Sequence, residues 1–428
     1  MLIILLEIFL IILGLLGLSF WFLSVFTSLG RGPGKFNLRG RVSFFDESFL
    51  RALEAISRTT FEYGAVPQIL NNGDEFFSSL LADIENAKKT IHIAVFIFRP
   101  QEAIGQQIIS ALLRKSQEGV QVRLLIDRNG SNKFSEATQF QLEKAGIKIV
   151  MFRPLRFGTV ARYHRRNHCR AFIMDGKFGY TGGIAIGQEW TGNAQDKDHW
   201  RDMMFKVSGA QARAIQKVFN TLWTNACGEI LTGDDVYPAI GEELTESKWV
   251  SLTSSPALET SLLRNVYWLS CMAAQKGIYV QNSYFFPSRY MRQVFIQKAQ
   301  EGIEVILMVP NTNNDERIVY HAGRFFYDQL LSAGVKIYEF QPTMIHSKTF
   351  LVDDCWSIVG SANMDVRSEE LNEENILCIL SEPFGLKMRE QFNADLAKCK
   401  EINLDVWRKR PFLNKILEWI FGLVGHQL

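Results

Sequence analysis

One chemical pattern occurs twice in the chain. Residues 165–183 read RRNHCRAFIMDGKFGYTGG, and residues 343–361 read TMIHSKTFLVDDCWSIVGS. In each copy a basic residue follows the histidine by two positions, an aspartate follows it by seven, and a Gly-Gly or Gly-Ser pair begins seven positions later. These residues are His168, Arg170 and Asp175 in the first copy and His346, Lys348 and Asp353 in the second. Two copies at matched spacing predict one active site assembled from two halves.

The repetition extends well beyond the motif. EGVQVRLLID (118–127) corresponds to EGIEVILMVP (301–310), and AGIKIVMFRP (145–154) corresponds to AGVKIYEFQP (333–342). Short runs rich in Val and Ile alternate with helical patterns, which is typical of sheets covered by helices. The motif histidines lie 346 − 168 = 178 residues apart, far beyond the roughly 20 to 50 residues of a solenoid unit. The sequence therefore predicts two fused α/β domains that form one shared active site.

The chain divides into five predicted segments. They are a transmembrane anchor (1–30), a linker (31–46), a first domain (47–235), a second domain (236–400) and a basic, amphipathic C-terminal tail (401–428). In the tail, a basic stretch at 408–410 precedes apolar residues at helical spacing. Such a helix either lies at a bilayer interface or docks on the core of the second domain.

The N-terminal segment is long enough to cross a membrane. From Leu2 to Leu29 it is almost wholly apolar, with Glu7 as its only charged residue, and about 20 apolar residues span a bilayer. A cleaved signal peptide has a basic start and a shorter apolar core, and neither is present before Arg31. Basic residues follow the run, at 31, 35, 39 and 41. By the positive-inside rule, the chain is predicted to be a single-pass protein of the cell membrane with cytoplasmic catalytic domains.

Charge and cysteine spacing limit the classes of ligand and partner that the chain is expected to bind. A formal net charge of +2 over 428 residues gives no overall basic footprint, so a nucleic-acid partner is not expected. Residues 153–170 are an exception, with six arginines and no acid, which suits phosphate or an acidic lipid surface; the alternative is a solvated basic face. The six single cysteines show no metal-binding spacing, and neither a metal nor another cofactor is predicted.

The motif suits chemistry at a phosphodiester. Each copy is expected to start a strand, so the histidine and the base two positions later point to the same face. Cleavage of a phosphodiester needs cations on the phosphoryl oxygens, a nucleophile, and a proton donor for the leaving alkoxide. Two histidines can share the last two tasks, while Arg170 and Lys348 supply the charge.

The paired motifs, their Gly pairs and Asn363 resemble the phospholipase D superfamily. The sequence in and around the motifs is most similar to bacterial cardiolipin synthases. The similar segments are RNH, MDGKFGYTGG, HWRDMMFKVSG, HSKTFLVDD, IVGSANMD and LNEE. The resemblance covers residues 45–400. It implies that His168 is the nucleophile and His346 the general acid and base, although the symmetry of the motifs also allows the reverse assignment.

The resemblance also implies roles for further residues. Substrate is expected to meet Ser361, Asn363 and Gly183, and the carboxylates of Glu189 and Glu374 are expected to orient the imidazoles. Asp175 and Asp353 are expected to order loops of the catalytic site. The first copy departs from the family pattern, because Arg170 stands where Lys is usual and Ala185 where Asn is common.

The implied function is a membrane-bound phosphatidyltransferase. It would move the phosphatidyl group of one phosphatidylglycerol onto histidine and then to a second phosphatidylglycerol, making cardiolipin and releasing glycerol without a cofactor. Two alternatives remain open from the sequence. One is a hydrolytic phospholipase D or a related nuclease, and the other is a lipid-binding protein whose first half-site is degenerate.

Overall fold

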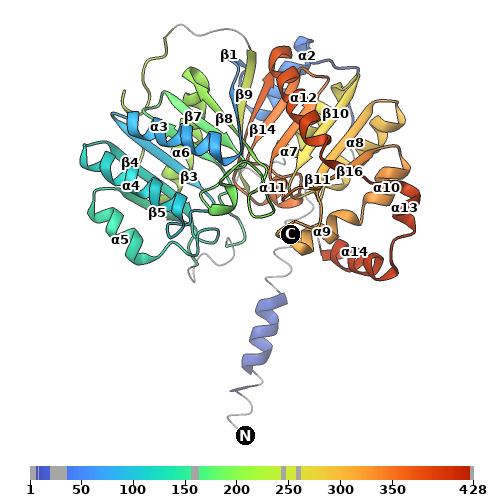
Figure 1. Cartoon of the computed structure of the whole chain (residues 1–428), viewed down its shortest axis with the longest axis horizontal. Helices are drawn as coiled ribbons and strands as arrows, with labels where there is room; N and C mark the ends of the chain where they lie inside the picture. Colours follow the sequence, from blue (N-terminus) through green and yellow to red (C-terminus); the bar gives the residue numbers. More distant parts are fainter. Residues whose placement is uncertain are drawn as a thin grey trace.

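The structure, a computed structural model, describes residues 6–7, 9–19, 36–155, 163–241, 247–256 and 262–424. Within these ranges the body consists of two β-sheets standing next to each other, with helices on their outer faces (Figure 1). The predicted α/β fold with two related halves is confirmed, because both sheets contain the same order of strands.

The two sheets share a run of seven strands. In the first half the order is β2 (Gln68–Asn71), β8 (Met203–Ser208), β7 (Phe178–Gly182), β6 (Ala171–Met174), β3 (Thr90–Val95), β4 (Gln121–Asp127) and β5 (Lys148–Phe152). In the second half it is β9 (Ser247–Ser254), β15 (Glu374–Leu380), β14 (Trp356–Gly360), β13 (Lys348–Val352), β10 (Gly277–Asn282), β11 (Glu304–Pro310) and β12 (Lys336–Phe340). The last three strands of each run are parallel and the other neighbours antiparallel. Both sheets are therefore mixed.

The body contains three apolar cores, of which one joins the two halves. The outer core of the first half is formed with α3 (Asn72–Asn86), α4 (Ala103–Gln117) and α5 (Glu136–Lys144). That of the second half is formed with α7 (Leu262–Ala273), α8 (Arg289–Gln300) and α10 (Tyr327–Ser332). The third core lies between the sheets and includes α6 (Gly209–Cys227) and α12 (Glu382–Leu396). This shared core fixes the two halves against each other, and so fixes any site built across them.

The first predicted domain begins at residue 47, but residues 47–64 pack with the second half. Strand β1 (Glu62–Gly64) pairs with β9 and extends the second sheet, and β16 (Cys399–Glu401) extends its other edge. Helix α2 (Glu47–Ser57) buries Phe49 in the second-half core, where its ring meets Trp356 edge-on at 5.2 Å. The sequence shows that α2 has an apolar face but not which core receives it.

The C-terminal helix docks and also leaves an apolar surface. After α13 (Leu404–Arg408), α14 (Phe412–Val424) packs on α9 (Arg317–Arg324). Its Glu418 is buried against Arg410, and its Phe421 ring stacks on His321. The exposed side chains of the helix include Phe412, Leu413, Trp419, Ile420 and Leu423. The docked alternative for the tail is thus observed, while a second apolar face stays uncovered by the described residues.

Of the predicted anchor, the structure describes residues 6–7 and 9–19, which are helical and have exposed side chains. The rest of residues 1–30 lies outside the described ranges. The helical stretch projects from the body at the end where α14 lies (Figure 1). No helix in the described part of the chain has both the length and the hydropathy needed to cross a membrane, so the anchor stays a prediction.

Candidate active site

The two motif histidines come together where the halves meet. Each lies just before a central strand, His168 before β6 and His346 before β13. The backbone N–H of His168 donates to Glu373 O of the second half at 2.9 Å, and that of His346 donates to Arg201 O of the first half at 2.7 Å. Each motif is therefore held by backbone of the opposite half, as the predicted shared site requires.

The side chains cross between the halves in the same way. His168 Nδ1 lies 2.9 Å from Glu374 Oε1 and 3.0 Å from Glu374 Oε2. His346 Nδ1 lies 2.7 Å from Asp202 Oδ2. All four side chains are buried. Each imidazole is thus oriented by a carboxylate that the other half provides.

Sequence reasoning identified Glu374 as an imidazole partner but missed Asp202. Strand register shows that the two acids are equivalent, because β7 pairs Gly182 with Met204 while β14 pairs Gly360 with Ile376. Each acid stands two residues before the paired position. The available signal was an acid at the start of the strand after each Gly pair, in HWRDMMF and in LNEENIL.

Glu189, the other predicted partner, lies elsewhere. It belongs to the short 3-10 helix η2 (Gln188–Trp190), and its carboxylate pairs with Arg99 at 2.6 Å. The neighbouring Trp190 is the residue that reaches the site. Its Nε1–H lies 3.2 Å from Asp202 Oδ2 and 3.3 Å from His346 Nδ1.

The Gly-Gly and Gly-Ser pairs shape the space around the carboxylates. Gly182 and Gly360 both have φ +151°, and a Cβ there would lie 2.4 Å and 2.3 Å from backbone oxygens of the next strand. The second residue differs between the halves. A Cβ on Gly183 would lie 2.3 Å from Asp202 Oδ1, whereas Ser361 Oγ donates to Glu374 Oε2 at 2.5 Å. Gly183 therefore leaves room for the carboxylate of Asp202, whereas Ser361 donates a hydrogen bond to that of Glu374.

Glu374 is held by more than Ser361. Ser368 Oγ, from α11 (Val366–Glu370), donates to Glu374 Oε1 at 2.7 Å, and Asn372 Nδ2 donates to the same oxygen at 3.4 Å. Helix α11 lies at the lower ends of the central strands in Figure 1. The carboxylate that orients His168 is therefore fixed on both oxygens.

A cation lies beside the imidazoles in each half. Lys348 Nζ is 3.1 Å from both ring nitrogens of His346, and it also donates to Ser283 Oγ at 2.8 Å. Arg170 is 1% exposed and donates from Nη1 to His168 O at 2.5 Å. Its Nε has no hydrogen-bond partner within the described ranges. A buried guanidinium with an unused donor is suited to a phosphoryl oxygen.

Burial sets the protonation of the site. It acts with the charge of Arg170 to lower the pKa of His168 to about 4, and with that of Lys348 to lower the pKa of His346 to about 3. Burial alone would raise the pKa values of Glu374 and Asp202, but the paired histidines and surrounding donors lower them. At neutral pH each ionised carboxylate accepts the Nδ1–H of a neutral imidazole, which puts the ring's lone pair on Nε2. In His346 this nitrogen lies 3.1 Å from Lys348 Nζ.

The Ala185 departure from the family pattern has a structural counterpart. In the second half, Asn363 Oδ1 accepts a hydrogen bond from Ser283 Oγ at 2.9 Å. The pairing of β3 with β6 and of β10 with β13 makes Phe96 the equivalent of Ser283, and Ala185 stands at the position of Asn363. The first half therefore has Phe96 and Ala185 where the second half has the hydrogen-bonded pair Ser283 and Asn363. Because Phe96 has no hydroxyl, the amide of an asparagine at position 185 would have no such partner.

Asp175 and Asp353 lie away from the imidazoles. The carboxylate of Asp175 accepts the backbone N–H groups of Lys88, Lys89 and Thr90. That of Asp353 accepts those of residues 275, 276 and 277. Each aspartate thus ties the turn after a motif strand to the start of the neighbouring antiparallel strand, which is loop ordering rather than contact with reacting atoms.

Comparison with known proteins gives consistent matches. The family model described as "Cardiolipin synthase, PLD-like domain" matches residues 80–223 and 270–396. A cardiolipin synthase of Geobacillus kaustophilus (strain HTA426) is 33% identical over 360 residues, which are 83% of this chain and 71% of that protein. Cardiolipin synthase 2 of Bacillus anthracis is 31% identical over 381 residues, or 89% of this chain and 74% of that protein.

A solved structure shares the fold. The crystal structure of phosphatidylserine synthase from Haemophilus influenzae Rd KW20 superposes with a TM-score of 0.68 at 16% sequence identity. The match covers 89% of this chain and 100% of that one. The two molecules therefore share the same overall fold.

Proposed function

The chain belongs to the cardiolipin synthase family with phospholipase D-like domains and is a phosphatidyltransferase of that type, and we propose that it makes cardiolipin from two molecules of phosphatidylglycerol. The observation that carries this proposal is the crossed arrangement of His168–Glu374 and His346–Asp202 around two cations. It offers a nucleophile, a proton carrier and charge for one phosphodiester.

In the first step, Nε2 of His168 attacks the phosphorus of the donor lipid. The bond from phosphorus to the glycerol oxygen breaks, and His346 gives that oxygen a proton, so glycerol leaves. Glu374 faces the positive charge that develops on the phosphorylated imidazole. Arg170 and Lys348 neutralise the non-bridging oxygens.

In the second step, the free hydroxyl of a second phosphatidylglycerol gives its proton to His346 while its oxygen attacks phosphorus. The phosphorus–nitrogen bond breaks, cardiolipin forms, and both histidines regain their starting states. With His168 as the nucleophile, as the family resemblance implies, His346 is the proton carrier, and Lys348 Nζ lies beside its ring nitrogens. The charge of Lys348 also lowers the pKa of His346. A bound phosphodiester anion offsets that charge, so proton uptake by His346 accompanies substrate binding.

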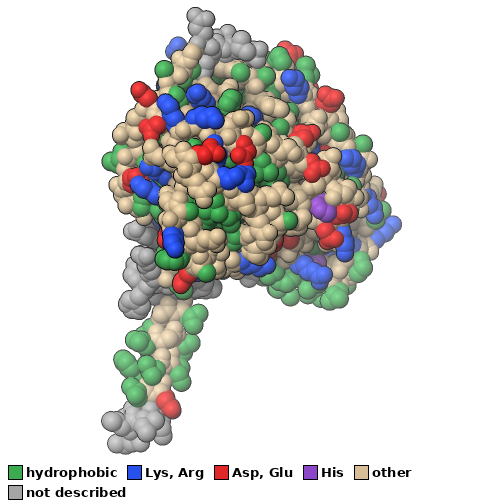
Figure 2. Space-filling model, turned by 60° about the vertical axis from the view of Figure 1, so that its left-hand side comes forward, with side chains coloured by type: hydrophobic (Ala, Val, Ile, Leu, Met, Phe, Trp, Pro, Cys, Tyr) green, Lys and Arg blue, Asp and Glu red, His purple; other side chains and the backbone are tan. Residues whose placement is uncertain are grey.

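We further propose that the enzyme is held at the cell membrane by residues 1–30, with its catalytic halves in the cytoplasm. The exposed apolar residues 9–19 and the exposed apolar side chains of α14 support this, because both lie at one end of the molecule (Figures 1 and 2). An alkaline carbonate wash of membranes tests the anchor. Release of the full-length protein into the wash would contradict it.

The catalytic proposal is tested with the full-length protein and labelled phosphatidylglycerol in mixed micelles. Wild type is expected to release glycerol, to form cardiolipin and to carry label on acid-labile phosphohistidine. His168→Ala abolishes both product and label, while His346→Ala lowers turnover by at least about a hundredfold. His321→Ala on α9 is the matched control. Phosphatidic acid as the sole product would indicate a hydrolase, and a folded wild type that never labels or turns over would support the degenerate lipid-binding alternative.

A further inference from the structure

Helix α14 has the reverse polarity of an ordinary surface helix. Its one acidic residue, Glu418, faces the body and is 1% exposed, whereas aromatic and aliphatic side chains point outward. The outward residues, exposed by 44% to 76%, are Phe412, Leu413, Trp419, Ile420 and Leu423. In an ordinary surface helix the apolar side faces the core and the charges face water. The outer side of α14 therefore suits an apolar environment.

Buried contacts fix the helix in this orientation. Glu418 Oε2 accepts from Nε and Nη2 of Arg410 at 2.9 Å and 2.5 Å, and Glu418 Oε1 lies 3.6 Å from Arg324 Nε. Gly422 permits a close approach, because a Cβ there would lie 2.6 Å from Cγ of Phe325. A rotation that buried the apolar side of α14 would break the Glu418 pairs and carry Gly422 away from Phe325.

The apolar surface continues onto α9 and the residue after it. Ile318, His321 and Phe325 share one side of this segment by helical spacing, and the His321 ring stacks on Phe421 of α14. Ile318 and Phe325 are themselves exposed. We call Ile318, Phe325 and the five outward residues of α14 the α14–α9 face.

Basic side chains border α14. Among residues 408–424 the exposed charged residues are Arg408, Lys409 and Lys415. Arg408 pairs with Asp328 at 3.1 Å, and Lys415 Nζ donates to Arg408 O at 2.8 Å. An apolar helix side that contains a Trp and has Lys or Arg next to it is typical of helices that lie at a bilayer interface.

The length and place of α14 suit such a position. Its 13 residues extend roughly 20 Å at about 1.5 Å per residue, less than the hydrocarbon thickness of about 30 Å. The exposed helical residues 9–19 project from the same end of the body (Figure 1), and hydrophobic side chains gather along the lower edge of the body in Figure 2. A bilayer that receives residues 9–19 would therefore also meet α14.

The α14–α9 face is connected to the reacting groups by few residues. The segment before α9 contains Asp315, whose carboxylate accepts the hydroxyl hydrogen of Tyr284 at 2.8 Å. The ring of Tyr284 meets that of His346 edge-on, with centroids 5.8 Å apart. A bilayer against the α14–α9 face would therefore lie on the His346 side of the site.

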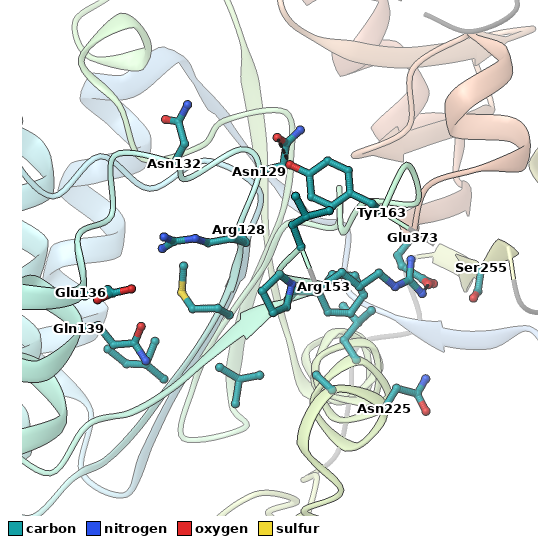
Figure 3. A pocket seen from close by; sticks show the side chains of 18 residues that line it. Arg128, Asn129, Asn132, Glu136, Gln139, Arg153, Tyr163, Asn225, Ser255 and Glu373 are labelled. Atoms are coloured by element: carbon teal, nitrogen blue, oxygen red, sulfur yellow. Dashed lines mark hydrogen bonds and ion pairs between the residues drawn. The ribbon is translucent and has the colours of Figure 1, made fainter. Parts of the chain in front are cut away.

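The cavity shown in Figure 3 differs from this face. It has a volume of about 1160 Å³ and lies beside β5 and the end of α6. Its lining includes the charged residues Arg128, Glu136 and Arg153 together with apolar side chains. Charged groups are costly to place among acyl chains, so the cavity is not part of the contact that we infer.

We propose that the α14–α9 face lies in the interfacial layer of a lipid bilayer and sets the orientation of the catalytic body on the membrane. This inference goes beyond the proposed function, which assigns the attachment to residues 1–30. A single attachment leaves the body free to turn. A second contact, held rigidly through Glu418, directs the end that carries α14 toward the lipid.

Quenching of Trp419 by brominated lipid tests the contact. Full-length protein is reconstituted in vesicles of phosphatidylglycerol and phosphatidylcholine, with bromine near the headgroup end or the methyl end of the phosphatidylcholine chains. The sequence has nine tryptophans, so the Trp419 signal is the difference between wild type and Trp419→Phe. Bromine near the headgroup end is expected to remove about half of this signal and bromine near the methyl end less, because interfacial helices lie about 5–10 Å deep.

Phe45 provides a matched control. It is 73% exposed and stands just before α2, at the opposite end of the body (Figure 1). Phe45→Trp in the Trp419→Phe background adds a tryptophan there, and its signal should not change with bromine at either depth. Equal quenching at positions 45 and 419 would overturn the proposal. So would an unquenched Trp419 in protein that floats with the vesicles, which would leave the face to a protein partner or a second copy.

Leu423→Asp tests the orientation. A charge at this exposed position is tolerated by the fold but disfavours entry into the apolar layer. The measured quantity is the ratio of cardiolipin formation in vesicles to that in mixed micelles. It is expected to fall about tenfold, because a small micelle can approach the site from any direction whereas a vesicle presents one extended surface.

Phe45→Asp should keep the wild-type ratio. An unchanged ratio with Leu423→Asp would overturn the orienting role, whether or not the two activities fall together. Absence of cardiolipin with wild type in both media would instead count against the proposed function, and the quenching of Trp419 would still decide the membrane contact.

Discussion

Lys348 and Arg170 occupy equivalent positions, but only the lysine can lose its charge near neutral pH. Burial, with repulsion from Arg170, outweighs the attraction of Asp202 and lowers the pKa of Lys348 to about 7. Above that pH the free enzyme loses the proton of Lys348 and with it one of the two charges for the donor phosphate. We therefore expect kcat/KM, which reports the free enzyme, to fall as the pH rises through about 7.

Lys348→Arg tests this assignment, because a guanidinium stays charged throughout the range. The expected result is a lower maximum, since Arg differs in shape, and an alkaline limb that is shifted upward or absent. The measurement is kcat/KM for transfer between pH 5.5 and 9 in mixed micelles. An alkaline limb that stays at the same pH in Lys348→Arg would assign it to another group.

Site residues divide by how their positions are encoded in the sequence. His168, His346 and the two cations follow from short spacing, because each basic residue follows its histidine by two positions. Glu374 came from resemblance, whereas Asp202 was missed, since its equivalence to Glu374 depends on strand register across a repeat of unequal loop lengths. Ser361 was placed on the substrate, but its hydroxyl binds Glu374. Contacts of this kind depend on tertiary packing, which the spacing of residues along the sequence does not predict.

At the scale of elements, each motif strand is tied by one aspartate to the antiparallel strand beside it. Asp353 has φ +52° and accepts N–H groups from residues 275–277, immediately before and at the start of β10. Asp353→Ala removes this carboxylate. We expect a loss of about 2 kcal/mol in the free energy of unfolding, because hydrogen bonds to a charged acceptor are among the stronger ones. Urea unfolding of the purified protein measures it.

Asp354→Ala provides a matched control. Asp354 also has a left-handed backbone, φ +56°, so alanine meets similar backbone strain at both positions. Its carboxylate forms an ion pair with Arg389 at 3.7 Å, which is longer than the hydrogen bonds of 2.7 to 2.9 Å that the Asp353 carboxylate accepts. Equal destabilisation by the two substitutions would mean that backbone strain, and not the carboxylate contacts, explains the effect.

The repeat in the sequence was sufficient to predict the strands of the paired segments and motifs, which are β4, β5 and β6 in the first half and β11, β12 and β13 in the second. It was not sufficient for α2 and β1, which precede the first half in the chain but complete the second sheet. An amphipathic helix such as α2 reports that one face is buried. The core that receives it depends on which surface is left open by the rest of the fold.

At the scale of the molecule, neither half contains a complete site. His168 needs Glu374 of the second half, and His346 needs Asp202 of the first. Residues that connect the halves are also packed into the body, with Leu231 and Val236 buried in the core between the sheets. The halves of one chain are therefore fixed against each other, which favours a site formed within a single chain over one formed by exchange between chains.

Co-expression of two inactive variants tests this arrangement. His168→Ala and His346→Ala each retain one intact histidine, and an enzyme whose halves exchanged between chains would regain some sites with both. Because the crossed contacts are buried within one chain, we expect the co-expressed pair to show no more cardiolipin formation than the two variants measured separately. Wild type co-expressed with His168→Ala controls for expression. Its cardiolipin formation should be proportional to the amount of wild-type chain present. Recovery of transfer in the mixed pair, with the two chains isolated together through different tags, would show that the site is completed by a second copy.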